Sequence, residues 1–441
     1  MEDAFIIHGG KPLKGKIILS GAKNVSLKVV IAALLFKGKV ILHNIPKIED
    51  IFELFHLIKT LGGSGKFIDT NTVSIDSTDL NENRLDFLHA SKIRTSFMLF
   101  APLLYRFKKA FIPNPGGCRL GARPIDRIVE GMQKLGVTVT YNSETGYYDA
   151  SIIKKPEGSY VFQKPSHTGT EFLILMSVFC KGTILIRNAA LEPEIDDLIQ
   201  FLNEGGANIT RIGEDIKVVG VDELRQKRPY TIVSDRNEAV TYAVLGIITK
   251  GDITIGSIPK NYIQTFISFV KKIGAGVEQV KNDSWRFYYK GDLMATNIIT
   301  DSHPGFMTDW QPNWAVLMTQ ANGTSTIHER IFENRFAFVD ELVKVGAKIE
   351  YYQPKIENPQ SYYMFNYDVH KDHKQAIKIY GPQRLHNGVL NIADLRAGAT
   401  LAIAALLAQG ESVINGASIL ERGYENFIGK VTHLGGDIKK V

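Results

Sequence analysis

The strongest constraint on the fold of this chain is a pattern that recurs six times along its 441 residues. Each copy begins with an apolar helical segment, continues through a short strand that opens near a glycine, and ends in a second helical segment that stops at a glycine. The six stop glycines lie about 70–90 residues apart: Gly62, Gly136, Gly206, Gly274, Gly346 and Gly435. This recurrence predicts a fold built from six similar repeats.

The two kinds of helical segment differ in where their apolar residues lie. The first kind, such as residues 24–37 (NVSLKVVIAALLFK), is apolar on nearly every side, so we expect it to be buried. The second kind, such as residues 48–63, has one polar face and should cover the outside. Short alternating segments such as residues 137–141 close each repeat as strands. The predicted class is therefore α/β, with βαβα-type repeats packed as two groups of three.

A domain boundary is expected near residue 232. A strand at residues 14–21 precedes the first repeat, and the fourth repeat opens near residues 232–239. Three repeats on each side of this boundary give two similar domains. The pattern alone leaves open whether the N-terminal strand joins the first or the second group.

The composition excludes several classes of protein. With 44% hydrophobic and 22% charged residues, and a net charge of +6 without a long basic run, the chain is typical of a globular protein with no nucleic-acid partner. Its two cysteines make no disulfide framework, which indicates a reducing compartment. The start, MEDAFIIHGG, lacks a signal peptide, and no apolar run approaches the roughly 20 residues that cross a bilayer. We therefore expect a cytoplasmic protein without membrane insertion.

Cys118 lies in a glycine-rich segment, residues 114–126 (NPGGCRLGARPID), that ends at the expected start of a helix. Arg119 and Arg123 add positive charge, and such surroundings favour a reactive sulfur. The alternative interpretation is an unreactive free cysteine in a turn. Cys180 ends an apolar run and is expected in the core.

Polar and basic residues precede most of the buried helical segments, as in residues 393–396 (ADLR). A helix start presents unpaired N–H groups and partial positive charge, and arginine adds bidentate hydrogen bonds to phosphate or carboxylate. These segments predict a strongly anionic substrate that carries several phosphate or carboxylate groups. The alternative is that four of their residues only cap helices: Ser166, Ser234, Asp309 and Asp394.

Seven sequence blocks carry a resemblance to a known family. They are ILSGAKN (18–24), PGGCRLGARPID (115–126), NAALEPEI (188–195), PGFMTDWQ (304–311), FENRF (332–336), ADLRAG (393–398) and ERGYE (421–425). With these blocks in this order over essentially the whole chain, the sequence resembles the UDP-N-acetylglucosamine 1-carboxyvinyltransferases, a family of enolpyruvyl transferases.

The resemblance implies a particular fold, that of the enolpyruvyl transferases and EPSP synthase. It consists of two inverse α/β domains with six βαβαββ-type repeats, three in each domain. In that fold the N-terminal strand belongs to the C-terminal domain. We therefore expect one domain at residues 22–232, a second at residues 1–21 and 233–441, and the active site in the cleft between them.

The resemblance also implies a reaction. Its members transfer the enolpyruvyl group of phosphoenolpyruvate to the 3-hydroxyl of UDP-N-acetylglucosamine and release phosphate. Cys118 resembles the family's general acid, a cysteine that protonates the methylene carbon of phosphoenolpyruvate. That family residue can also hold phosphoenolpyruvate as a covalent adduct, and fosfomycin alkylates it. Asp309 resembles the base that contacts the sugar hydroxyl. Addition–elimination needs no redox cofactor, and the sequence shows neither a dinucleotide-binding motif nor a metal-binding motif, so no cofactor or metal is expected.

The remaining site residues follow from the same resemblance. Lys23 and Arg422 join Cys118 and Asp309 as catalytic residues. The residues expected at phosphoenolpyruvate are Lys23, Asn24, Arg123, Arg396 and Arg422. Those expected at UDP-N-acetylglucosamine are Arg94, Arg123, Pro124, Ile125, Asp126, Arg127, Lys164, Ser166, His167, Asp309 and Ile331.

The chain departs from the family pattern at a few positions. Lys28 stands where the family usually has proline, and SHTGTE (166–171) places His167 and Thr168 beside the expected nucleotide site. His167 either hydrogen-bonds to uracil or diphosphate, or fills space. Two other functions stay open: transfer to shikimate 3-phosphate, as in EPSP synthase, and non-catalytic binding of a sugar nucleotide.

Overall fold

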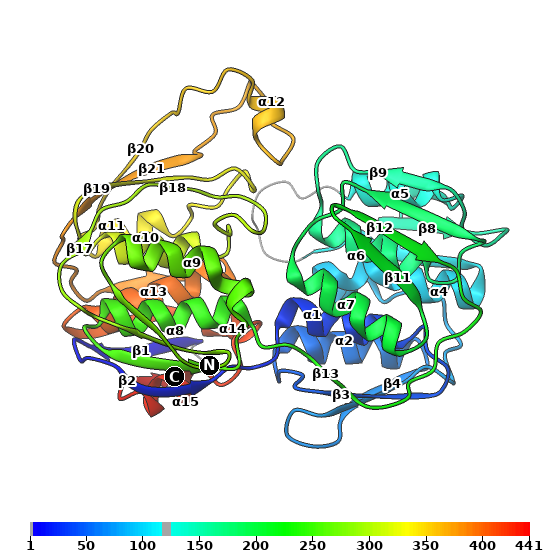
Figure 1. The fold of residues 1–441 in the computed structure, drawn as a ribbon, viewed down its shortest axis with the longest axis horizontal. Coiled ribbons are helices and arrows are strands. Elements are labelled where there is room, and N and C mark those ends of the chain that lie inside the picture. The colour runs from blue at the N-terminus through cyan, green and yellow to red at the C-terminus, as the bar shows by residue number, and fades with distance from the viewer. Residues whose placement is uncertain (1–2, 117–124) are drawn as a thin grey trace. The chain divides into compact units, whose positions relative to one another are not determined.

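The computed structural model describes residues 3–116 and 125–441, which form two compact units. Residues 21–116 and 125–233 make up the first unit, and residues 3–20 and 234–441 make up the second. Figure 1 shows both chain ends in the second unit, with the N-terminal strands beside the C-terminal helix.

Each of the six second helices is followed by a cap residue and then by a stop glycine in the left-handed region. The φ angles of these glycines run from 82° to 103°, a conformation that favours glycine at a helix end. The helices are α2 (Glu49–Thr60), α5 (Asp126–Lys134), α7 (Pro193–Glu204), α9 (Lys260–Lys272), α11 (Val339–Lys344) and α15 (Phe427–His433). The sixfold pattern expected from the sequence is therefore confirmed at the helix ends.

Three sheets form in the described part of the first unit, and they follow one plan. In the third repeat, β10 pairs in parallel with β9 and antiparallel with β12, and β12 pairs with β11. The sheet orders are β13-β3-β5-β4, β6-β8-β7 and β11-β12-β10-β9. The strands are β3 (Lys39–His43), β4 (Ser64–Phe67), β5 (Val73–Asp76), β6 (Lys109–Pro113), β7 (Thr138–Asn142), β8 (Tyr147–Ser151), β9 (Ser159–Val161), β10 (Thr183–Arg187), β11 (Asn208–Ile212), β12 (Asp215–Val219) and β13 (Tyr230–Thr231).

The second unit repeats this plan and contains both N-terminal strands. β2 pairs in parallel with β14, and β1 lies between β23 and β24. The orders are β15-β16-β14-β2, β17-β19-β21-β20 with β18 beside β19, and β22-β23-β1-β24. The strands are β1 (Ala4–Gly9), β2 (Lys14–Ile18), β14 (Asp252–Gly256), β15 (Gly276–Lys281), β16 (Ser284–Tyr288), β17 (Leu293–Met294), β18 (Ile298–Ile299), β19 (Ala321–His328), β20 (Lys348–Tyr351), β21 (Ala376–Gly381), β22 (Val389–Asn391), β23 (Gly410–Asn415) and β24 (Asp437–Lys440).

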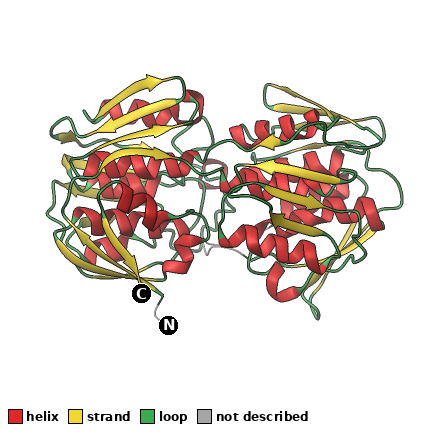
Figure 2. Cartoon of the chain, turned by 90° about the horizontal axis from the view of Figure 1, so that it is seen from below, coloured by secondary structure: helices red, strands yellow, loops and turns green. Residues whose placement is uncertain are grey.

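The first helices of the repeats form the centre of each unit, and the sheets lie around them (Figure 2). In the first unit they are α1 (Lys23–Ala33), η1 (Arg94–Leu99) with α4 (Phe100–Phe107), and α6 (His167–Ser177). In the second unit they are α8 (Arg236–Ile248), α10 (Gln311–Met318) and α13 (Leu395–Leu407). All residues of α8 are buried, as are all those of α1 except Asn24. The predicted α/β class and the predicted burial of these helices are confirmed.

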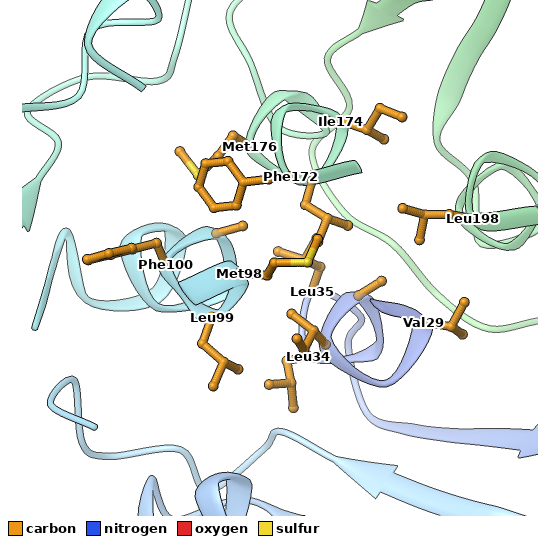
Figure 3. Packing of buried hydrophobic residues seen from close by; sticks show 14 of the residues in the cluster. Val29, Leu34, Leu35, Met98, Leu99, Phe100, Phe172, Ile174, Met176 and Leu198 are labelled. Carbon is orange, nitrogen blue, oxygen red and sulfur yellow. The ribbon is translucent and has the colours of Figure 1, made fainter. Parts of the chain in front are cut away.

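The core of the first unit joins these central helices through large apolar side chains. Figure 3 shows Leu35, just after α1, Met98 in η1 and Phe172 in α6 among the buried side chains of this core. Cys180 belongs to this core, as expected, and burial raises the pKa of its thiol. The remaining short helices are α3 (Phe87–Ala90), α12 (Pro359–Tyr362) and α14 (Ala417–Glu421). Across the described ranges, no helix has both the length and the apolar composition that spanning a bilayer requires.

Candidate active site

Asp309 is the centre of a charged cluster in the second unit, just before α10. Its Oδ1 lies 2.7 Å from Arg335 Nη2, and its Oδ2 lies 3.2 Å from Arg396 Nε. Asn237 Nδ2 donates to the same Oδ2 at 3.4 Å. Arg335 is buried, whereas the side chain of Asp309 keeps 23% of its surface exposed. The structure therefore brings the predicted residues Asp309 and Arg396 together, at an aspartate whose side chain is only partly buried.

The capping alternative holds for some of the four polar residues and fails for the others. Ser166 caps α6, and Asp394 caps α13 by accepting from two backbone amides. Ser234 is not a cap, because the adjacent Asp235 accepts the amide hydrogen bonds that begin α8. Asp309 does not cap α10 either; its carboxylate is turned to the two arginines instead.

Arg396 is held in place by more than Asp309. Its Nη1 donates to the Tyr424 hydroxyl at 3.2 Å, and its guanidinium lies 5.5 Å from the centre of that ring. The Tyr424 hydroxyl also bonds to Thr241 Oγ1 at 2.8 Å. Burial works against the charge on Arg396, but the Asp309 carboxylate outweighs it and raises the pKa of the guanidinium. Arg422 follows the last residue of α14 and precedes Tyr424 by two residues in the sequence.

Glu329 connects the Ile331 backbone to the segment that carries Asp309. Its Oε1 accepts from the Ile331 amide at 2.8 Å and from the Phe332 amide at 3.0 Å. Its Oε2 accepts from the Thr308 hydroxyl at 2.9 Å, one residue before Asp309. Glu329 is fully buried, and this burial raises the pKa of its carboxyl despite the opposing Arg335 charge. Two sites predicted from sequence, Ile331 and Asp309, are thus fixed to each other.

In the first unit, Lys23 begins α1 and forms a buried ion pair with Asp50. The Nζ atom lies 2.9 Å from Asp50 Oδ2, and the lysine and the aspartate keep only 10% and 8% of their side-chain surface. Asp50 stands in the first turn of α2, where a helix start stabilises a carboxylate. The predicted residue Asn24 follows Lys23 and is half-buried.

Two further cations predicted for the sugar nucleotide lie close to each other. Arg127 Nη1 donates to the Lys164 carbonyl at 3.5 Å. Burial lowers the pKa of both groups, and for Lys164 the Arg127 charge adds to the effect. Beside Arg127 in the sequence, Ile125 is buried and Asp126 is exposed at the first position of α5.

Arg94, at the start of η1, lies near the end of the described part of the Cys118 segment. Its Nη1 donates to the Pro115 carbonyl at 3.5 Å. At the next residue, Gly116, an added Cβ would lie 1.5 Å from the Ser91 carbonyl oxygen, so only glycine fits there. Cys118, Arg119, Arg123 and Pro124 lie outside the described residues, and the roles expected for them stay predictions.

A trio of charged residues joins the start of α6 to α1; Lys28 and Glu171 are buried, and His167 keeps 24% of its side-chain surface exposed. Glu171 is fully buried, with Oε2 at 3.1 Å from Lys28 Nζ and Oε1 at 3.2 Å from His167 Nε2. Burial opposes charge on His167, but the Glu171 carboxylate outweighs it and raises the pKa of the imidazole. Burial likewise opposes charge on Glu171, but His167 and Lys28 together lower the pKa of this carboxyl. Two of the positions at which the chain departs from the family pattern, Lys28 and His167, therefore meet at one carboxylate.

Several of these partners were missed by the sequence analysis. They are Asp50, Glu171, Glu329 and Tyr424, each of which pairs with a residue far away in the chain. Among residues 3–116 and 125–441, no group of His, Cys, Asp and Glu side chains is arranged to hold a metal ion. Chemically, a partly buried carboxylate between guanidiniums can accept a proton from a hydroxyl while the arginines bind an anion.

Comparison with known proteins gives consistent matches over the whole chain. Residues 7–431 match the family model described as EPSP synthase (3-phosphoshikimate 1-carboxyvinyltransferase). The UDP-N-acetylglucosamine 1-carboxyvinyltransferase of Idiomarina loihiensis is 35% identical over 442 residues, covering 100% of this chain and 99% of the relative. That of Thermodesulfovibrio yellowstonii is 36% identical over 440 residues, covering 100% of both.

Solved structures show the same fold. The enolpyruvyl transferase NikO from Streptomyces tendae superposes with a TM-score of 0.85 at 22% identity, covering 100% of this chain and 99% of that one. EPSP synthase from Acinetobacter baumannii gives a TM-score of 0.73 at 18% identity, covering 100% of both chains. At these identities the likeness concerns the fold, and it confirms the predicted fold class.

Proposed function

The chain belongs to the EPSP synthase family and, within it, to the UDP-N-acetylglucosamine 1-carboxyvinyltransferases, and from this membership we propose its reaction. It transfers the enolpyruvyl group of phosphoenolpyruvate to the 3-hydroxyl of UDP-N-acetylglucosamine and releases phosphate, a step in peptidoglycan precursor synthesis. The observation that carries the proposal is the partly buried Asp309 carboxylate, held between Arg335 and Arg396 in a chain similar to these enzymes over its full length.

The proposed reaction proceeds by addition and elimination. In the addition, Cys118 gives its proton to the methylene carbon of phosphoenolpyruvate, the sugar oxygen bonds to the adjacent carbon, and Asp309 takes the hydroxyl proton. In the elimination, a proton leaves the new methyl group and returns to the Cys118 sulfur while the bond to phosphate breaks. The departing phosphate takes the proton from Asp309, which restores both groups.

Fixed cations stabilise the charge of phosphoenolpyruvate and of the leaving phosphate in this proposal. Lys23, Arg396, Arg422 and Arg123 supply the positive charge, and Asn24 supplies an amide. The burial of Lys23 against Asp50 and the anchoring of Arg396 by Tyr424 support the proposal, because held side chains lose little freedom when they bind. The proposal assigns residues of both units to the same two substrates.

The sugar nucleotide is proposed to contact a second set of residues. The adjacent cations Arg127 and Lys164 suit its diphosphate, and so does His167, whose charge the Glu171 carboxylate favours. The rest of this set is Arg94, Arg123, Pro124, Ile125, Asp126, Ser166, Asp309 and Ile331. We place the reaction in the cytoplasm, where the Cys118 thiol stays reduced.

A phosphate-release assay with phosphoenolpyruvate and UDP-N-acetylglucosamine tests this function. We expect turnover that is lost in Cys118→Ala and in Asp309→Asn, and inactivation of the wild-type protein by fosfomycin. Cys180→Ala is the matched control, because this buried thiol lies in the core and should leave turnover intact. Phosphate release with shikimate 3-phosphate instead would support EPSP synthase activity, and release with neither acceptor would support non-catalytic binding.

A further inference from the structure

The fifth repeat contains an unusually long connection between its last two strands. In this repeat β20 and β21 are joined by residues 352–375, a connection of 24 residues (375 − 352 + 1) that we call the insert. The corresponding connections in the first four repeats are residues 68–72, 143–146, 213–214 and 282–283. Figure 1 shows the insert, with α12, extending beyond β20 and β21. A hairpin needs only a few residues to turn, so most of the insert is not required for the connection itself.

The insert has a small aromatic core of its own. The rings of Tyr363 and Tyr367 stack with centroids 4.9 Å apart and planes 8° apart. Tyr363 and Phe365 are buried, and Phe365 contacts the His373 ring at 5.7 Å. Gln353 Nε2 donates to the His373 carbonyl at 2.9 Å, which joins the two ends of the insert. The insert is therefore packed around its own aromatic side chains.

The insert binds residues 329–333 through several hydrogen bonds. Arg330 Nε and Nη2 donate to the Tyr362 carbonyl at 3.2 and 3.1 Å, and the guanidinium lies 4.3 Å from the centre of the Tyr362 ring. In the other direction, the Met364 amide donates to the Arg330 carbonyl at 2.8 Å. Gln375 Nε2 donates to the carbonyls of Glu329 and Phe332 at 2.9 and 3.0 Å.

Residues 329–333, which the insert binds, include or contact residues of the proposed sugar-nucleotide site. Glu329, whose carbonyl the insert binds, uses its carboxylate to hold the Ile331 amide and the Thr308 hydroxyl. Thr308 precedes Asp309, the proposed base. All of these contacts lie within the second unit.

We propose that the insert is a positioning element for the acceptor substrate, acting through Arg330, Tyr362 and Gln375 to fix Ile331 and the Thr308–Asp309 segment. This inference rests on the proposed function. Weakening these contacts should weaken binding of UDP-N-acetylglucosamine and leave phosphoenolpyruvate binding unchanged, because Arg396 is also anchored by the Tyr424 hydroxyl, which lies outside the insert.

The test compares two arginine variants in steady-state kinetics. Arg330→Met removes the hydrogen bonds to Tyr362 together with an ion pair to Asp301 at 2.8 Å. We expect the KM for UDP-N-acetylglucosamine to rise about tenfold, since charged hydrogen bonds no longer restrain the segment, while the KM for phosphoenolpyruvate stays the same. Arg286→Met is the matched control: Arg286 also pairs with an aspartate, Asp252, and lies 4.3 Å from a tyrosine ring, but on the β14–β16 sheet. The control should change neither KM.

An unchanged KM for UDP-N-acetylglucosamine in Arg330→Met, or equal rises in both KM values, would overturn the inference. Hydrogen exchange on the wild-type protein gives a second test that needs no variant. UDP-N-acetylglucosamine should slow exchange of the Ile331 and Met364 amides, whereas phosphoenolpyruvate alone should not, and equal rates with and without the sugar nucleotide would also overturn it. If the wild-type protein releases no phosphate, the proposed function itself fails, which is a different outcome.

Discussion

The trio of Lys28, Glu171 and His167 leads to a quantitative prediction about stability. Removing one partner of a buried ion pair costs about 3–5 kcal/mol, because the remaining charge stays buried without compensation. In Lys28→Met the Glu171 carboxylate keeps His167 at 3.2 Å, so we expect a loss near the lower end, about 3 kcal/mol. Native-state hydrogen exchange of the α1 and α6 amides measures this loss in the first unit alone.

The same trio predicts a defined dependence on pH. The raised pKa of His167 means that its stabilising effect is fully present below its ordinary value of 6.5 and is lost as pH rises through the folded-state value. The lowered pKa of Glu171 means that its effect is present above 4.5 and is lost as pH falls through the folded-state value. The trio should therefore stabilise the first unit most between pH 4.5 and 6.5. Because the Lys28 charge lowers the pKa of His167, Lys28→Met should raise it further, as an NMR titration of the ring would show.

A matched control lies in the same unit. Glu53 also pairs with a lysine and a histidine, Lys92 at 2.6 Å and His89 at 2.7 Å, but the lysine is 43% exposed. Lys92→Met should cost less than about 1 kcal/mol, since water screens exposed pairs. If Lys28→Met costs no more than Lys92→Met, or if the pKa of His167 falls in Lys28→Met, the account of a tightly coupled trio is wrong.

Three further predictions follow from single contacts. Tyr424→Phe removes the hydroxyl that bonds to Arg396 and Thr241. It should lower the free energy of unfolding by about 1–3 kcal/mol and raise the KM for phosphoenolpyruvate. An unchanged KM would show that Asp309 alone holds Arg396. Burial, aided by the Arg330 charge, lowers the pKa of His328 to about 4. As pH falls from 6.5 to 4, the unfolded chain therefore binds a proton on His328 that the folded chain does not, and the free energy of unfolding should fall by about 3 kcal/mol. Comparing wild type with His328→Asn in urea at both pH values measures this, and equal pH dependence in the two proteins would refute it. Burial of Cys180 and its raised pKa predict that a thiol reagent at pH 8 labels this residue only after denaturation, and mass spectrometry of the labelled native protein would detect any exception.

The sequence predicted the parts of this molecule that depend on local pattern. The stop glycines need positive φ wherever a second helix ends, so Gly62 and Gly435 could be identified without knowing what packs around them. The central helices could be identified because a segment that is apolar on all sides, such as α13, has no face for water. The family blocks likewise pointed to Asp309 and Arg396, which the structure brings to 3.2 Å.

The contact partners of the site residues could not be predicted from the sequence, and the reason is physical. Lys28 and Glu171 are 143 positions apart (171 − 28) and meet only because two buried helices of different repeats pack together. An isolated glutamate within SHTGTE looks like a surface residue until the neighbouring helix is placed against it. The insert was overlooked for a similar reason, since residues 352–375 lack a helical or alternating pattern and owe their order to contacts with residues 329–333.

The way the central helices begin separates two kinds of repeat. Side chains cap α6, α8 and α13, through Ser166, Asp235 and Asp394, so part of their backbone N–H demand is already met. In the described part of the chain, no side-chain hydrogen bond caps α1, η1 or α10. These helices begin at or just after Lys23, Arg94 and Asp309, three residues to which the proposed reaction assigns substrate contacts. A helix start without a cap keeps backbone N–H groups for an anion, so α1, η1 and α10 can bind substrate through their backbone as well as their side chains. The capped starts of α6 and α13 are proposed to contact substrate through side chains alone, those of Ser166, His167 and Arg396.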